Sequence, residues 1–68
     1  MAAFDLDKRY IATYSRYQSG RGYVAEVYIL LHGKPVETFE AHGRMLPDME
    51  KAVWAMAERI HRRLAKPR

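Results

Sequence analysis

The chain has 68 residues, of which 49% are hydrophobic, a formal net charge of +4 and no cysteine. This length allows one small domain, the hydrophobic content argues against disorder, and the lack of cysteine excludes disulfides and cysteine-ligated zinc. The chain opens without a basic region and a long apolar run, and no apolar run reaches membrane-spanning length. The sequence therefore predicts a soluble, cytoplasmic protein without a signal peptide or a membrane contact.

Three segments have the composition of β-strands. Residues 9–17, 22–32 and 36–42 are rich in aromatic and β-branched residues or alternate between apolar and polar positions. Short turn signals separate them, with Gly20 in the first turn and Gly33 in the second. Because short turns join neighbouring antiparallel strands, the pattern predicts a β-meander.

The hydrophobic period then changes to that of a helix. Pro47 suits a first helical turn, acids follow it, and basic residues and Pro67 mark the other end. The apolar stripe consists of Met49, Val53, Met56, Ile60 and Leu64. We therefore predict one α+β domain over residues 1–68: a three-stranded antiparallel β-meander packed on one C-terminal α-helix over residues 47–65 (β-β-β-α).

The register of the strands decides which side chains face the helix. A two-residue turn at Ser19 and Gly20 places Gln18 opposite Arg21, with the paired positions Tyr14 and Ala25, Ala12 and Val27, and Tyr10 and Ile29 on the core face. The third strand allows two registers. A two-residue turn after His32 buries Val36 and Thr38, whereas a three-residue turn buries Phe39 and Ala41. We favour the second register because Phe39 is the largest apolar side chain in the strand.

One helix covers only one face of such a sheet. The opposite face is predicted to carry four apolar residues, Ile11, Val24, Tyr28 and Leu30. Exposed apolar groups of this kind usually mark an interaction site. These four residues are therefore candidates for an interface with a second copy of the chain or with another protein.

No set of residues predicts catalysis. His32, His42 and His61 have no metal-motif spacing, and Glu37 and Glu40 fall on opposite faces of a strand. The Gly-Arg-Gly segment at 20–22 precedes a strand, whereas phosphate loops precede a helix. We expect no enzyme activity, no cofactor and no metal.

The positive charge is unevenly spread along the chain. Residues 59–68 carry five basic and no acidic residues, whereas residues 1–58 carry seven basic and eight acidic residues. Residues 8–23 form a second basic zone. Such asymmetry favours DNA or RNA as a partner. The candidate contact residues are Arg9, Arg16, Tyr17, Arg21, Lys34, Arg62, Arg63 and Lys66.

The predicted order of elements resembles that of the small sheet-plus-helix domains in phage integrase arms and AP2-type plant regulators. The resemblance lies in architecture, with no shared sequence motif, and it implies a sheet whose side chains enter a DNA groove. We predict a small binding module that contacts nucleic acid through its basic hairpin and basic C-terminal tail. The alternative is a module for homodimerisation or protein binding that uses the open sheet face.

Overall fold

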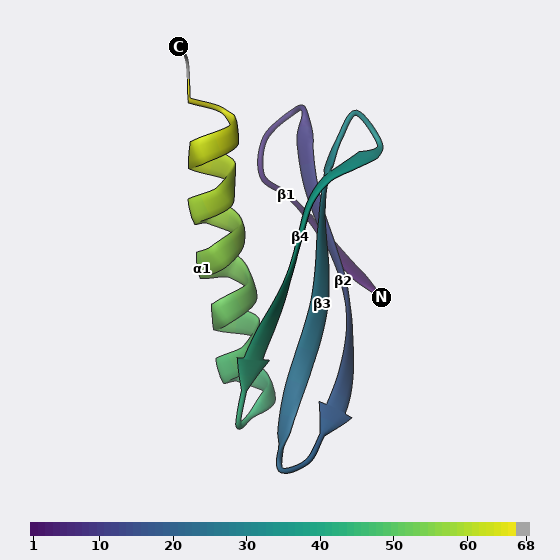
Figure 1. The fold of residues 1–68 in the computed structure, drawn as a ribbon, viewed down its shortest axis with the longest axis vertical. Coiled ribbons are helices and arrows are strands. Elements are labelled where there is room, and N and C mark those ends of the chain that lie inside the picture. The colour runs from purple at the N-terminus through teal and green to yellow at the C-terminus, as the bar shows by residue number, and fades with distance from the viewer. Residues whose placement is uncertain (67–68) are drawn as a thin grey trace.

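The computed structural model describes residues 1–66 and confirms the α+β class with one C-terminal helix. An antiparallel sheet is formed by β1 (Ala2–Asp5), β2 (Tyr10–Ser19), β3 (Gly22–Leu31) and β4 (Lys34–Gly43), in that spatial order, and α1 (Leu46–Leu64) lies along one of its faces (Figure 1). Pro67, predicted as the helix stop, and Arg68 lie outside the described residues.

The prediction of three strands was wrong, because β1 adds a fourth strand at the edge of β2. Phe4 of β1 faces the helix and stacks on the Trp54 ring, with ring centroids 3.7 Å apart. Phe4 also meets Tyr14 of β2 edge to face at 6.3 Å. The alternation of Ala2, Phe4 and Leu6, which all pack against the core, is the sequence signal for this strand.

The first hairpin has a different register from the predicted one. Its turn residues are Gly20 and Arg21, so Ser19 lies opposite Gly22 and Tyr14 lies opposite Val27. Each residue of β2 therefore pairs with a residue of β3 two positions later than predicted; Gln18, for example, lies opposite Tyr23 instead of Arg21. Because side chains alternate with a period of two, each residue keeps its predicted face. Tyr10, Ala12, Tyr14, Ala25, Val27 and Ile29 are all buried in the core.

The second hairpin turns Phe39 and Ala41 towards the core, through a turn and a bulge that the sequence did not indicate; Ala41 is buried and Phe39 is partly buried. The turn has two residues, His32 and Gly33, both with positive φ, and Leu31 lies opposite Lys34. A bulge between Ile29 and Leu30 then shifts the pairing by one residue. Phe39 is consequently opposite Val27 and packs against the core, which agrees with the register favoured from the sequence. Val36 is exposed.

The helix packs on the sheet through Met49, Val53 and Ala57, which are fully buried. Its start is fixed by a close approach between Gly43, the last residue of β4, and the first helical turn. A Cβ atom on Gly43 would meet the backbone nitrogen of Met49 and would lie 2.7 Å from the Met49 Cα atom. Only glycine fits between β4 and α1 at this point.

The molecule is elongated, with principal extents of 42 × 19 × 15 Å. The β1–β2 loop, the β3–β4 turn and the C-terminal end of α1 lie at one end (top of Figure 1). The β2–β3 turn and the β4–α1 connection lie at the opposite end. This arrangement decides which charged residues can act together.

Candidate functional site

The eight predicted nucleic-acid contacts fall at the two ends of the molecule. Arg9, Lys34, Arg62, Arg63 and Lys66 belong to the end that holds the helix C-terminus, whereas Arg16, Tyr17 and Arg21 belong to the end that holds the β2–β3 turn. The predicted basic hairpin is therefore not one surface.

The first end gathers basic residues from three chain segments, and we call it the basic end. Its members are Lys8, Arg9, Lys34, Arg59, Arg62, Arg63 and Lys66. The backbone N–H of His32 donates to the Arg9 carbonyl at 3.2 Å, which joins the β3–β4 turn to the β1–β2 loop. On the helix, Arg63 Nη2 donates to Glu37 Oε2 of β4 at 2.7 Å.

Asp7 holds the basic end together. Its Oδ1 atom accepts the backbone N–H groups of Arg9 at 2.6 Å and Tyr10 at 2.9 Å. Its Oδ2 atom lies 2.7 Å from His61 Nε2 on the helix, and because a carboxylate only accepts, His61 is the donor. The hydrogen bond from His61, followed by the Arg9 backbone N–H, lowers the pKa of Asp7 from 3.8 to about 2.

This lowered pKa predicts a specific acid sensitivity. A carboxyl whose pKa is depressed by folding stabilises the native state above its unfolded pKa and loses that contribution as pH falls through the folded value. The Asp7 contribution should be complete above about pH 4 and lost towards pH 2. Urea unfolding from pH 7 to pH 2.5 should show a smaller loss of stability in Asp7→Asn than in the wild type.

The matched control for this prediction is Asp5→Asn, which replaces a carboxylate on the open face opposite Ile11. The control should keep the acid sensitivity of the wild type. Equal pH profiles for Asp7→Asn and the wild type would contradict the assigned role of Asp7.

At the opposite end, Arg16 is turned towards the helix. Arg16 Nη1 lies 3.7 Å from Glu50 Oε2, and the Tyr14 hydroxyl donates to the same oxygen at 3.3 Å. Burial and the neighbouring Glu50 carboxylate raise the pKa of Tyr14 above its usual value. Arg16 thus joins the sheet to the first turns of α1, while Tyr17 lies on the other face of the sheet opposite Val24.

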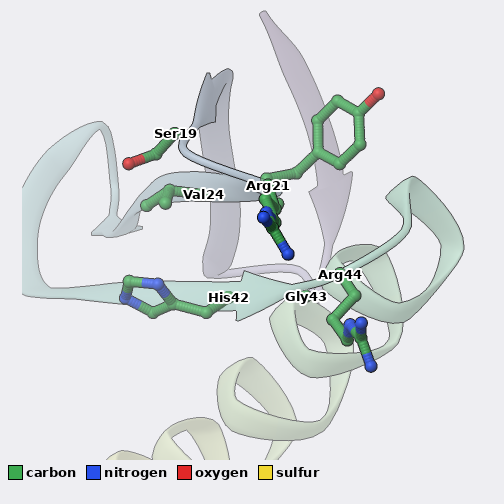
Figure 2. A pocket seen from close by; sticks show the side chains of 8 residues that line it. Ser19, Arg21, Val24, His42, Gly43 and Arg44 are labelled. Carbon is green, nitrogen blue, oxygen red and sulfur yellow. The ribbon is translucent and has the colours of Figure 1, made fainter.

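An open hollow of about 410 Å³ lies beside the β2–β3 turn (Figure 2), and we call it the turn hollow. It is lined by Ser19, Arg21, Gly22, Tyr23, Val24, His42, Gly43 and Arg44. The two arginines come from separate segments, the β2–β3 turn and the β4–α1 connection. Sequence reasoning omitted Arg44, because its neighbour in space, Arg21, is 23 positions away along the chain.

The sheet face away from the helix, here called the open face, carries acidic rather than basic strand residues. The strand register places Asp5, Glu26 and Glu40 on this face, with Glu26 directly opposite Glu40. In the four described strands no lysine or arginine stands on it, since Arg16 and Lys34 pair with helix-side residues. The part of this face around the three acids is therefore unsuited to a phosphate backbone, whereas its end beside the β2–β3 turn carries Ser19, Val24 and His42 of the turn hollow.

The predicted interface residues do not form one exposed group. Ile11 and Tyr28 are 38% and 43% exposed, and Leu30 is half-buried. Val24 is only 6% exposed, because Tyr17 and His42 flank it on the neighbouring strands. Along β3, Glu26 stands on the same face between Val24 and Tyr28 and separates the two. The exposed apolar surface lies instead around the β3–β4 hairpin, and this apolar patch consists of Ile11, Tyr28, Leu30, Pro35 and Val36.

The histidines and acids of residues 1–66 are dispersed over the surface. No group of three or more His, Asp or Glu side chains within this part of the chain has the arrangement of a metal site. His32 lies in a turn, His42 pairs with Glu40, and His61 binds Asp7. No described helix has the length and apolarity that crossing a membrane requires.

Comparison with known proteins gives no relative from which a function can be transferred. No family model, no curated protein and no solved structure matches this chain. The resemblance to integrase arms and AP2-type regulators therefore remains one of predicted architecture. The activity of this chain has to be inferred from its own charges and exposed side chains.

Proposed function

We propose that this chain is a nucleic-acid-binding module that contacts the phosphate backbone of duplex DNA through the basic end. The observation that supports the proposal is that three chain segments lying at one end of the molecule carry seven basic residues: the β1–β2 loop, the start of β4, and the last turns of α1 with the residues that follow them. Lysine and arginine side chains in such a cluster supply the sequence-independent part of nucleic-acid affinity.

Most of these bases remain available for phosphate. Arg63 is bound to Glu37 at 2.7 Å, and Arg9 lies 3.8 Å from Asp7. Among residues 1–66, the other five members of the basic end have no carboxylate oxygen within ion-pair distance. The contacts of Asp7 and His61 also fix the loop and helix relative to each other, which limits the entropy lost on binding.

The test is the salt dependence of duplex binding. Four or five phosphate contacts predict a slope of log K against log salt of about −3.5 to −4.5. Fluorescence anisotropy with a mixed-sequence duplex of ~16 base pairs, measured from ~50 to ~200 mM salt, gives this slope. Absence of binding at ~50 mM salt would overturn the proposal.

A second candidate function is homodimerisation through the apolar patch. It is favoured by the exposure of Ile11, Tyr28 and Val36 next to a hollow of about 270 Å³. Sedimentation should then show a dimer that Tyr28→Ser dissociates without loss of stability, because Tyr28 lies outside the core. Thr13→Ser, at the neighbouring position on β2, is the control and should leave the dimer intact. A strict monomer at high micromolar concentration would contradict this candidate.

A further inference from the structure

We infer that the turn hollow is a second, separate site that binds a phosphate group. Arg21 and Arg44 both line it, one from the β2–β3 turn and one from the β4–α1 connection. Among residues 1–66, neither guanidinium has a carboxylate within ion-pair distance. Two arginines on one concave surface match the several acceptor oxygens of a phosphate better than single lysines do.

The backbone beneath these arginines is fixed by close packing. A Cβ atom on Gly22 would lie 2.7 Å from the Gly43 carbonyl oxygen, and Gly43 itself abuts the first turn of α1. The turn, the end of β4 and the helix start therefore hold one another in place, and Figure 2 shows Arg21 and Arg44 projecting from these neighbouring segments. The positive end of the helix dipole begins at Leu46, close to Arg44, and adds to the positive potential.

The remaining polar groups set the limits of the site. His42 lines the hollow, but its Nε2 atom lies 3.5 Å from Glu40 Oε1. Since Glu40 competes with the anion for His42, we assign the charged contacts to the two arginines. Ser19 contributes a neutral hydroxyl to the lining. The volume of about 410 Å³ leaves room for a group attached to the phosphate, such as a nucleoside.

The site does not depend on the basic end, which lies at the other end of the molecule. It is tested on the full chain by titrating inorganic phosphate and following the backbone amide and His42 ring signals by NMR at constant ionic strength. Saturable shifts of Arg21, His42 and Arg44 in the millimolar range are expected. Arg21→Ala/Arg44→Ala should abolish the shifts of the His42 signals, whereas Arg59→Ala/Arg62→Ala should keep them.

Two results would overturn this inference: the absence of saturable shifts, or equal shifts with acetate at the same ionic strength. The source of the phosphate is then distinguished with two short single strands, one with a 5′-phosphate and one with a 5′-hydroxyl. Because the basic end also contacts nucleic acid, binding at the hollow is read from the His42 signals. Saturation at a lower concentration of the phosphorylated strand supports a terminal phosphate, and saturation at equal concentrations supports backbone phosphates. Failure of duplex binding at the basic end leaves these shifts unchanged, so the two proposals fail separately.

Discussion

Gly43→Ala is expected to cost about 3 kcal/mol of folding free energy or more, since a new Cβ atom collides with backbone that cannot move cheaply. The Cβ would lie 2.7 Å from Met49 Cα and 2.8 Å from the Asp48 carbonyl carbon. A chain of this length has a total stability of about 3–10 kcal/mol, at 0.05–0.15 kcal/mol per residue. The loss is therefore comparable with the whole stability, and urea denaturation followed by circular dichroism measures it.

Gly20→Ala is the matched control for this prediction. Gly20 has a φ of +59°, and no heavy atom lies within 4 Å of the position that a Cβ atom would take there. Its replacement by alanine should lower the free energy of unfolding only by the cost of placing a residue with a Cβ atom in the left-handed region, about 1–2 kcal/mol. A Gly43→Ala protein at least as stable as Gly20→Ala would show that β4 and α1 do not meet as closely as described.

The double variant Arg62→Ala/Lys66→Ala is expected to weaken duplex binding roughly 60-fold at ~0.1 M salt. Each lost phosphate contact removes about 0.9 from the salt slope, so two contacts reduce it by about 1.8 and the binding lines converge near 1 M salt. Both side chains are exposed at the end of α1, so the fold should be unaffected. Anisotropy titrations across the salt range measure both quantities.

Arg16→Ala/Lys51→Ala removes the same two residue types and the same net charge from the other half of the molecule. Arg16 is engaged with Glu50, and Lys51 lies in the first turns of α1. This control should retain most of the wild-type slope. An equal loss in both double variants would mean that net charge, rather than the basic end, determines binding.

The elements with a strong period were predictable from the sequence. The apolar stripe from Met49 to Leu64 predicted the helix, which runs from Leu46 to Leu64. The alternation of residues in β2 and β3 predicted the buried face even though the turn was misplaced, because a shift of two residues preserves the faces. Phe39 was placed correctly on the strength of its size, although a bulge rather than a longer turn accounts for its position.

The features that depend on long-range contacts were not predictable. Strand β1 has four residues and is stabilised by the stacking of Phe4 on Trp54, which is 50 positions later in the chain. The hydrogen bond between Asp7 and His61 joins residues 54 positions apart in the chain and holds the β1–β2 loop against the C-terminal end of the helix. The sequence therefore indicated that the chain was basic, but only the topology separates the basic end from the turn hollow and from the acidic open face.

The most direct test of the basic end as the duplex-binding surface is a map of amide shifts in ¹⁵N-labelled protein on addition of a ~16-base-pair duplex. The shifts should concentrate in residues 8–9, 32–34 and 59–66, while Thr13, Glu26 and Glu40 on the open face remain unchanged. A map centred on the open face, with residues 59–66 unaffected, would contradict the proposed surface.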